Sequence, residues 1–196
     1  MNEWKVHWID NNMIFKILPL IKIWVDSAIL KPNSAILVVK PKYLKNIVLF
    51  FKYFFNNNFS ALMDIWGSDY PFRTHRFEVN FLILNLSLPY RIIIRTSTNE
   101  YIPITTISDI YSSAGWLERE VWDMYGVYFA GHKDLRRILT DYGFSGYPLR
   151  KDFPLTGYTE VRYDDTKKQV VLEPLEVSQE LRLFNFKSPW ENNYID

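Results

Sequence analysis

The clearest indication of the fold is the stretch Phe77-Glu78-Val79-Asn80-Phe81, in which apolar and polar side chains alternate. Successive side chains of a strand point to opposite faces of a sheet, so this alternation predicts a half-exposed antiparallel strand. We expect that strand over residues 77–87, between further strands at 61–66 and 91–96. Proline in both intervening stretches marks turns. The middle of the chain therefore predicts a mostly antiparallel sheet.

Toward the N-terminus, the chain adds helices and more strands. After Pro41, which suits the first turn of a helix, Leu44, Val48, Phe51 and Phe55 recur at helical spacing and form one apolar face. The other elements expected here are a helix from Asn11 or Asn12 toward Trp24, interrupted at Pro19, and strands over residues 24–30 and 35–39.

Toward the C-terminus, regular structure becomes sparse. We expect a short helix over residues 107–113, then Gly115, and a second helix over 116–125 that Gly126 ends. Together the elements predict an α+β domain over residues 1–130, in which helices pack on a mostly antiparallel mixed sheet.

Beyond residue 130 no helical periodicity lasts longer than one turn. Residues 158–163 and 169–172 can pair as a hairpin, and the rest resembles extended chain. Aromatic and aliphatic side chains recur throughout, so the segment is too apolar for a free, solvated tail. We therefore expect residues 131–196 to form an extended segment and tail that needs another surface to bury its apolar side chains.

Several classes of function are disfavoured by what the chain lacks. It contains no cysteine, which removes disulfides and the usual iron–sulfur ligands, and His7, His75 and His132 are too far apart for a zinc motif. Residues 143–146 lack the Gly-Lys-Ser/Thr ending of a phosphate loop. The longest apolar stretch, residues 13–30, is broken by charges and proline, so we expect no membrane span. A net charge of +1 argues against nucleic-acid binding.

The densest ionic stretch is Glu118-Arg119-Glu120-Val121-Trp122-Asp123. At helical spacing Arg119, Glu120 and Asp123 gather on one side, and Arg119 can pair with Asp123 four residues later. From residue types alone, this pattern favours a solvated helix face. An interface network, or an independent enzyme that uses Glu120 and Asp123 as acid and base, are the alternatives.

Two arginine-rich stretches follow, at residues 131–139 and 146–154. Arginines flanked by glycine, proline and aromatic residues suit planar, bidentate recognition of carboxylates or phosphates. Arg136 and Arg137 also have aliphatic neighbours at 135, 138 and 139. We therefore expect both guanidinium groups to be partly desolvated and paired.

In this order, these stretches resemble the signature of the 30-kDa-type core subunit of respiratory complex I, the NADH:ubiquinone oxidoreductase. Its first motif is matched by Glu118, Arg119, Glu120, Asp123, Met124, His132, Arg136 and Ile138, with Tyr125 at the second apolar place. The G-x-P-L-R-K-D-F motif follows at residues 146–153. Further matches are Glu160–Asp164, Glu173-Pro174, Gln179-Glu180, Arg182–Phe184 and Ser188–Glu191. The first 100 residues are similar only in outline, most clearly at Asp69-Tyr70-Pro71 and Arg76–Val79.

The resemblance implies a scaffold subunit in the quinone-reducing module of the peripheral arm, on the matrix side of the mitochondrial inner membrane. It implies contacts with the 49-kDa-type and 20-kDa-type subunits and other peripheral-arm subunits, with residues 131–196 wrapping a partner subunit. FMN, the iron–sulfur clusters and ubiquinone would be bound by other subunits, and this chain would hold no cofactor or metal and no catalytic residue.

The resemblance also moves the helix at 118–123 from a solvated face to an interface or buried network. It implies subunit-interface roles for Glu118, Arg119, Glu120, Asp123, His132, Asp134, Arg136, Arg137, Gly146, Pro148, Arg150, Lys151, Asp152, Phe153, Arg162, Arg182 and Trp190.

The two ends of the chain indicate which branch of the family it resembles. Near the N-terminus, Glu3 and Asp10 are acidic and no arginine precedes Arg73, so we expect no transit peptide. The chain also continues through Gly157 to Trp190, like mitochondrial and alphaproteobacterial members. A mitochondrially encoded subunit is therefore expected. The alternative is the equivalent subunit of a related membrane-bound hydrogenase or a chloroplast-type dehydrogenase complex.

Overall fold

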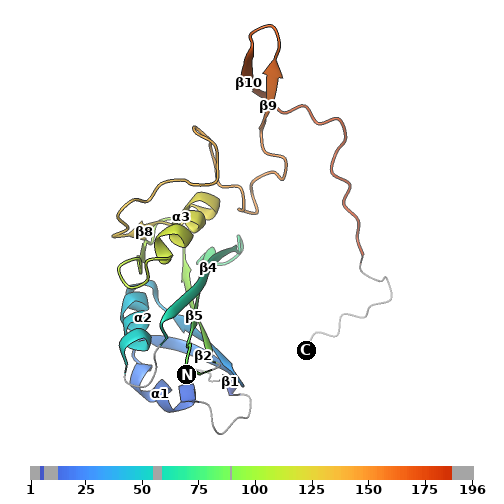
Figure 1. Cartoon of the computed structure of the whole chain (residues 1–196). Coiled ribbons are helices and arrows are strands. Elements are labelled where there is room, and N and C mark those ends of the chain that lie inside the picture. Colours follow the sequence, from blue (N-terminus) through green and yellow to red (C-terminus); the bar gives the residue numbers. More distant parts are fainter. Residues whose placement is uncertain (1–4, 7–12, 55–58, 89, 187–196) are drawn as a thin grey trace. The chain divides into compact units, whose positions relative to one another are not determined.

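The computed structural model describes residues 5–6, 13–54, 59–88 and 90–186 of the 196-residue chain. The chain forms two compact units, residues 1–153 and residues 154–196. The first unit is an α+β domain, and the second contains a hairpin and extended chain (Figure 1). The predicted fold class, a mostly antiparallel mixed sheet with packed helices and then an extended C-terminal tail, is confirmed.

A sheet of six described strands forms the centre of the first unit, in the order β1-β2-β3-β6-β5-β4. The pairs β1/β2 and β3/β6 are parallel, and the other three pairs are antiparallel. The strands are β1 (Lys5–Val6), β2 (Val25–Lys31), β3 (Ser34–Val39), β4 (Ala61–Asp69), β5 (Phe77–Leu84) and β6 (Arg91–Thr98).

The helices and shorter strands complete both units. In the first unit these are α1 (Met13–Ile21), the 3-10 turn η1 (Pro41–Tyr43), α2 (Leu44–Tyr53), α3 (Ala114–Tyr125), and the parallel pair β7 (Ile104–Thr105) and β8 (Phe129–Ala130). In the second unit the expected hairpin is confirmed as β9 (Thr159–Asp164) and β10 (Gln169–Pro174).

The two faces of β5 show how the sheet is buried. Phe77, Val79 and Phe81 point into the apolar core, which they share with the buried sides of α1, α2 and α3. Glu78 and Asn80 on the other face are buried as well, because Arg95 lies over them and its Nε contacts Glu78 Oε1 at 3.1 Å and Asn80 Oδ1 at 3.0 Å. The prediction of a half-exposed strand is therefore wrong for this face, where cross-strand polar pairing replaces solvent.

The expected elements differ from the observed ones mainly at their ends. Strand β5 stops at Leu84, before the predicted residue 87, because Asn85 Oδ1 accepts the backbone N–H groups of Ser87 and Leu88 and forms a turn. The expected interruption at Pro19 is wrong, because Pro19 lies inside α1, which continues to Ile21. The predicted caps Asn11 and Asn12, and the helix end at Phe55, lie outside the described residues.

No helix forms over residues 107–113 in this described stretch, contrary to the prediction. The N–H of Ile107 donates to the carboxylate of Glu118, and its carbonyl accepts from Ile110 and Tyr111, so the segment closes single turns. Helix α3 then begins at Ala114 and includes Gly115, which was expected to precede it. The bond from the Tyr111 N–H to the Ile107 carbonyl closes one α-turn, which the following residues do not continue into a helix.

Helix α3 packs closely against β4, and Gly67 permits the contact. A Cβ at Gly67 would lie 2.7 Å from Cδ2 of Tyr125, so any larger residue would push the ring away. At the end of α3, Gly126 has a φ of +75° and terminates the helix in the left-handed conformation, as expected. These two glycines fix the position of α3 against the sheet and hence that of its charged residues.

Candidate functional site

The charged helix α3 holds its carboxylates inside the first unit. Asp123 is fully buried, and its Oδ2 accepts the N–H groups of Ile138, Leu139 and Thr140 at 3.1, 2.7 and 3.0 Å. Its Oδ1 accepts the Thr140 hydroxyl at 2.7 Å and lies 3.3 Å from a terminal nitrogen of Arg137. Burial by itself raises the pKa of Asp123, but the hydrogen bonds lower this pKa by a larger amount. The pKa of Asp123 is therefore below its ordinary value. Asp123 therefore fastens the loop at 137–140 to α3.

Glu118 fastens a second loop, which contains Thr106 and Ile107, to α3. Its buried carboxylate accepts the Thr106 hydroxyl and, at 2.8 Å, the N–H of Ile107. Burial raises the pKa of Glu118 above its ordinary value, although both hydrogen bonds oppose the shift. The solvated face that residue types alone favoured is thus wrong for Glu118, Arg119 and Asp123, which are buried, and correct for Glu120, which is exposed. Glu118 and Asp123 lie in a buried network, one of the two environments that the resemblance implied.

Arg119 turns toward the loop at 131–136 and not toward Asp123, so the pair predicted from their spacing does not form. Its Nε donates to the carbonyl of Arg136 at 3.2 Å, and its guanidinium lies 4.9 Å from the ring centre of Trp116. In the same loop His132 Nδ1 accepts the N–H of Asp134, and Nε2 lies 3.1 Å from the carbonyl oxygen of Gly115. These contacts tie the loop to the first half of α3.

Arg136 and Arg137 differ, although the sequence predicted one environment for both. The Arg137 side chain is 27% exposed, pairs with Asp123 and lies 4.9 Å from the Tyr147 ring centre. The Arg136 side chain is 71% exposed and pairs with Asp134, two residues earlier, at 2.9 Å. The desolvated environment is therefore confirmed for Arg137 and wrong for Arg136, whose side chain is mostly exposed to solvent.

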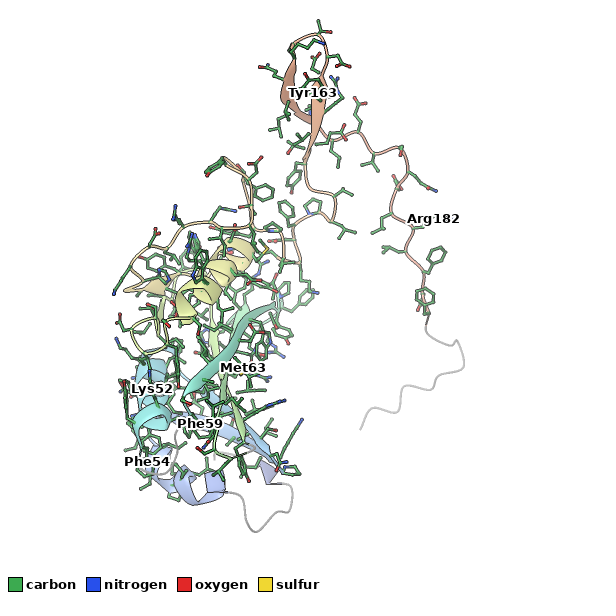
Figure 2. All side chains as sticks on the ribbon, in the orientation of Figure 1. Lys52, Phe54, Phe59, Met63, Tyr163 and Arg182 are labelled. Carbon is green, nitrogen blue, oxygen red and sulfur yellow. The ribbon has the colours of Figure 1, made fainter. Side chains whose placement is uncertain are left out.

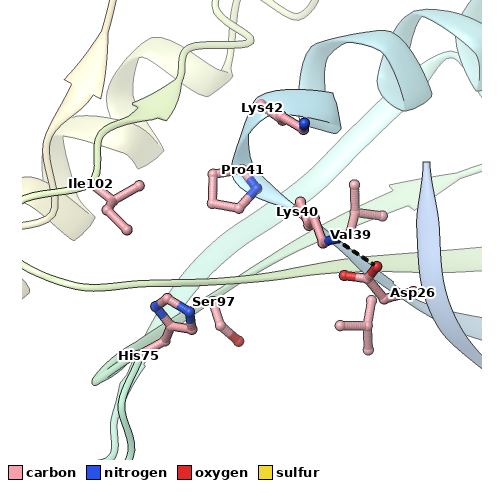
Figure 3. A pocket seen from close by; sticks show the side chains of 9 residues that line it. Asp26, Val39, Lys40, Pro41, Lys42, His75, Ser97 and Ile102 are labelled. Carbon is pink, nitrogen blue, oxygen red and sulfur yellow. Dashed lines mark ion pairs between the residues drawn. The ribbon is translucent and has the colours of Figure 1, made fainter. Parts of the chain in front are cut away.

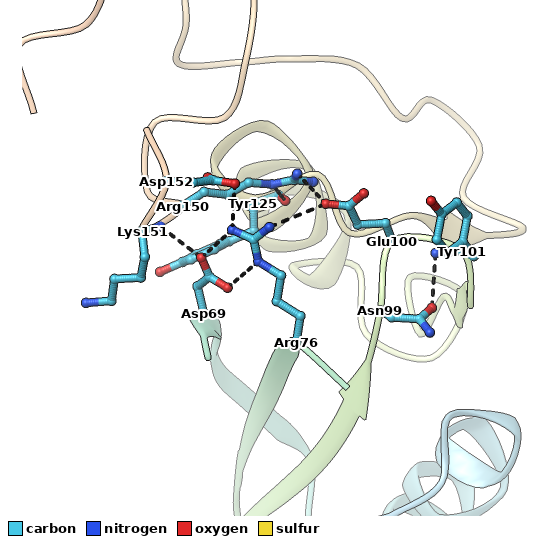
Figure 4. A network of polar contacts seen from close by, with 9 residues as sticks. All are labelled: Asp69, Arg76, Asn99, Glu100, Tyr101, Tyr125, Arg150, Lys151 and Asp152. Carbon is cyan, nitrogen blue, oxygen red and sulfur yellow. Dashed lines mark hydrogen bonds and ion pairs between the residues drawn. The ribbon is translucent and has the colours of Figure 1, made fainter. Parts of the chain in front are cut away.

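A second polar network joins the segment at 150–152 to the sheet (Figure 4). Arg76 holds the buried carboxylate of Asp69 with two bonds, at 2.7 and 2.8 Å. Asp69 also accepts the N–H of Lys151 at 2.8 Å, and Asp152 lies 3.1 Å from Arg76. Burial alone raises the pKa of Asp69, but the bonds from Arg76 and Lys151 outweigh it and lower the net pKa. Asp69 therefore binds the loop segment from a position 82 residues earlier in the chain.

Arg150 completes this network. Its Nε donates to the carbonyl of Tyr125 at 2.7 Å, and a terminal nitrogen pairs with Glu100 at 2.6 Å. Its guanidinium also lies 4.3 Å from the Tyr147 ring centre and 4.9 Å from that of Phe77. Arg150 thus connects α3, β5 and the loop after β6 within one unit.

The structure explains why glycine, Gly146, occupies the first position of the G-x-P-L-R-K-D-F motif. Its φ is +98°, and a Cβ would lie 2.8 Å from the Phe153 ring. Both the backbone conformation and the close ring therefore require glycine. The loop closes on itself around Phe153, and Pro148 between them is half-buried.

The remaining predicted residues are in the second unit. Arg162 pairs with Glu173 across the β9/β10 hairpin, and Arg182 is exposed with its guanidinium 5.8 Å from the Phe184 ring centre. Trp190 lies outside the described residues. The sequence did not predict that Asp69, Arg76, Glu100 and Thr140 belong to these networks. For Asp69 and Arg76 a signal was present, because they begin the D-Y-P and R-F-E-V stretches that are similar to the family pattern.

A pocket of about 480 Å³ shares no lining residue with either network (Figure 3). Val39, Pro41 and Ile102 provide apolar walls, and the exposed pair of Lys40 and Asp26 spans 3.7 Å. No group of three potential metal ligands occurs among the described residues. Within the same part of the chain, no helix is long and apolar enough to cross a membrane.

The fold and the site define an α+β domain followed in the chain by an extended C-terminal unit. In the domain, loop residues form hydrogen bonds and ion pairs with helix α3 and with the sheet. The chain belongs to the family described as respiratory-chain NADH dehydrogenase, 30 Kd subunit, whose model matches residues 37–159. The resemblance seen in the sequence is thereby confirmed.

Close relatives extend the match over most of the chain. NADH dehydrogenase [ubiquinone] iron-sulfur protein 3 of Marchantia polymorpha is 51% identical, covering 93% of this chain and 94% of its own. NADH-ubiquinone oxidoreductase subunit 9 of Prototheca wickerhamii is 47% identical, and the match covers 93% of this chain and 95% of the relative. Subunit 9 of Acanthamoeba castellanii is 50% identical, and the match covers 88% of this chain and 89% of the relative.

A solved structure supports the fold alone. A chain from the membrane-bound sulfane sulfur reductase, described as an archaeal respiratory membrane complex, superposes with a TM-score of 0.63 at 24% identity. The match covers 73% of this chain and 84% of the other. The α+β architecture therefore also occurs in a distantly similar respiratory protein.

Proposed function

We propose that this chain is a non-catalytic core scaffold subunit of the quinone-reducing module of respiratory complex I. That complex couples electron transfer from NADH to ubiquinone to proton pumping. Family membership supports the assignment to the complex. The observation that carries the scaffold role is the exposed apolar surface of the second unit, where none of the described residues, 154–186, belongs to the buried core.

Apolar side chains are exposed along the whole described part of this unit. Figure 2 shows the segment with Tyr163 and Arg182 labelled. Its exposed apolar residues are Leu155, Tyr158, Val161, Tyr163, Val170, Leu172, Val177, Leu181, Leu183, Phe184 and Phe186. A lone two-stranded hairpin is at best marginally stable in water, and contiguous exposed apolar surface marks a binding region. We infer that residues 154–186 wrap a partner subunit. Residues 131–153, which were expected to belong to the same wrapping segment, are left out of this proposal because they are part of the first compact unit.

The partners in this proposal are the 49-kDa-type and 20-kDa-type subunits and other peripheral-arm subunits, on the matrix side of the mitochondrial inner membrane. The ubiquinone-reductase names of the relatives support this choice over a hydrogenase or chloroplast-type complex. The independent-enzyme alternative loses its main support, because Asp123 is buried and bonded on both oxygens while Glu120 is exposed.

The signature residues divide into two sets in this proposal. The first set stabilises the first unit and so affects assembly only indirectly, through the fold of that unit. Its members are Glu118, Asp123, Arg137, Gly146, Arg150 and Phe153. Those with exposed side chains are free to meet another subunit directly, and they include Glu120, Asp134, Arg136 and Lys151, and Arg162 and Arg182 in the second unit.

Limited proteolysis tests the wrapping proposal. In the purified full chain we expect cleavage within residues 154–186, because the exposed backbone there lacks a packed core. In the assembled complex the same segment should resist the protease. Residues 59–153 serve as the internal control and should resist in both states. Equal resistance of residues 154–186 in both states would contradict a wrapping tail.

The purified chain is expected to bind no redox cofactor. It has no cysteine to ligate an iron–sulfur cluster, although the names of several relatives contain the words iron-sulfur. FMN, the clusters and ubiquinone belong to other subunits in this proposal. The measurement is the visible absorption spectrum with iron and flavin analysis, and a stoichiometric amount of either would show that the proposal is wrong.

Arg137→Ala is expected to reduce the amount of assembled complex while leaving turnover per assembled complex near normal. The change strands the buried carboxylate of Asp123, and because Arg137 keeps 27% exposure the cost should fall near 1–3 kcal/mol, between an exposed and a buried pair. Arg137→Lys keeps the charge but loses the planar fork, so it should be milder.

Arg73→Ala is the matched control, because this arginine also forms an ion pair, with Glu78 at 3.4 Å, but its side chain is 58% exposed. It should change complex abundance little. The measurement is abundance on native gels, beside NADH:quinone activity normalised to complex content. Full abundance of the Arg137→Ala complex with collapsed turnover would place Arg137 in the chemistry and remove the scaffold assignment.

A further inference from the structure

A groove of about 490 Å³ lies within the first unit, between the first half of α3 and the loop at 131–136. Arg119, Lys133 and Arg136 contribute three positive charges to its lining, and Asp134 contributes one negative charge. Because Asp134 already pairs with Arg136, the lining keeps an excess of positive charge at Arg119 and Lys133.

Arg119 is the unusual member of this lining. It is only 8% exposed, yet no described carboxylate lies within ion-pair distance of it, unlike Arg76 and Arg137. Its Nε donates to the carbonyl of Arg136. The Arg119 side chain also lines the groove, and its Nε bond is the only hydrogen bond that its guanidinium makes to the described residues. A nearly buried guanidinium without a carboxylate is costly unless a counter-ion binds it.

Trp116 gives the groove an apolar wall. Its side chain is 66% exposed, although tryptophan is normally well buried, and it lies 4.9 Å from the Arg119 guanidinium. Tryptophan and arginine are the residues most enriched at the energetic centres of protein interfaces. The indole and the guanidinium together offer an apolar face and a fixed bidentate fork at one place.

We propose that this groove binds an acidic segment of a neighbouring subunit, with an aspartate or glutamate on the fork of Arg119 and an apolar side chain against Trp116. A planar fork fits a carboxylate with two bonds, and Lys133 adds attraction at the rim. A small inorganic anion would leave the indole uncovered, which favours a protein segment. The inference rests on the proposed function and adds to it a specific docking site on the first unit.

The test compares the purified full chain with the purified complex. Oxidative footprinting measures the reactivity of Trp116, and carbodiimide cross-linking joins lysine amines directly to carboxylates that they contact. We expect Trp116 to lose its reactivity in the complex, and Lys133 to form a zero-length link to an aspartate or glutamate of another subunit. Lys133→Glu should abolish that link, whereas Lys42→Glu, a change at an exposed lysine beside the other pocket, should leave it intact.

The outcomes separate this inference from the proposed function. Absence of the chain from the purified complex would contradict the proposed function itself. If the chain is present but Trp116 stays as reactive as in the free chain, the groove is open to solvent and the inference is wrong. Protection of Trp116 without any carboxylate link at Lys133 also overturns it, because the occupant would then not be an acidic segment.

Discussion

Asp123→Ala is expected to lower the free energy of unfolding of the full chain by about 3–5 kcal/mol, the cost of breaking a buried ion pair. The change leaves the N–H groups of Ile138, Leu139 and Thr140 without their acceptor and leaves Arg137 without its counter-ion. These three hydrogen bonds are partly buried, and a donor that has given up water without a replacement is costly. A typical domain is stable by about 5–15 kcal/mol, so this loss is a large fraction of the total.

Glu120→Ala is the matched control for this experiment. Glu120 is a carboxylate on the same helix, three residues earlier, and it is exposed. Its replacement should change stability by less than about 0.5 kcal/mol, as is usual for surface positions. Chemical denaturation of the purified chain, followed by circular dichroism, measures both variants. Equal effects of the two variants would mean that the Asp123 bonds contribute no more than a surface charge.

Arg76→Ala is expected to have the second-largest effect, a loss of about 2–4 kcal/mol. It strands the buried carboxylate of Asp69 and removes the contacts of Arg76 with Glu100 and Asp152. The value lies slightly below that of a fully buried pair, because the Arg76 side chain keeps 20% exposure and Asp69 still accepts the N–H of Lys151.

Arg73→Ala is the control for Arg76, because Arg73 pairs with Glu78 at 3.4 Å but its side chain is 58% exposed. We expect this control to cost about 0–1 kcal/mol. Denaturant midpoints measure the stability, and protease cleavage near residues 150–152 reports whether the loop has left the sheet. Unchanged protection of this loop in Arg76→Ala would show that Asp69 does not need Arg76 to hold it.

These expectations change how substitutions in the signature segment should be interpreted. Asp123, Arg137 and Arg150 bond to groups of their own unit, so their loss should first weaken the fold of the chain. Reduced assembly would follow because less folded subunit is available. An exposed residue such as Lys133 should instead affect assembly without lowering the stability of the free chain.

The local pattern of the sequence determined most of the secondary structure. Apolar residues at helical spacing after Pro41, alternating residues around Val79, and Gly126 at a helix end each specify their element through neighbours a few positions away. The family assignment also came from the sequence, because the order and spacing of motif residues such as Glu118 and Arg150 do not depend on the fold.

Tertiary structure determined which charges are buried and what they bind. A helical pattern places Arg119, Glu120 and Asp123 on one side of α3, but it cannot show that loop residues 137–140 cover Asp123 and leave Glu120 in water. The partners of Asp123 lie 14–17 residues away, and Lys151 meets Asp69 across 82 residues. Hydrogen bonds and desolvation depend on distances in space, which sequence spacing determines only within a few turns of chain.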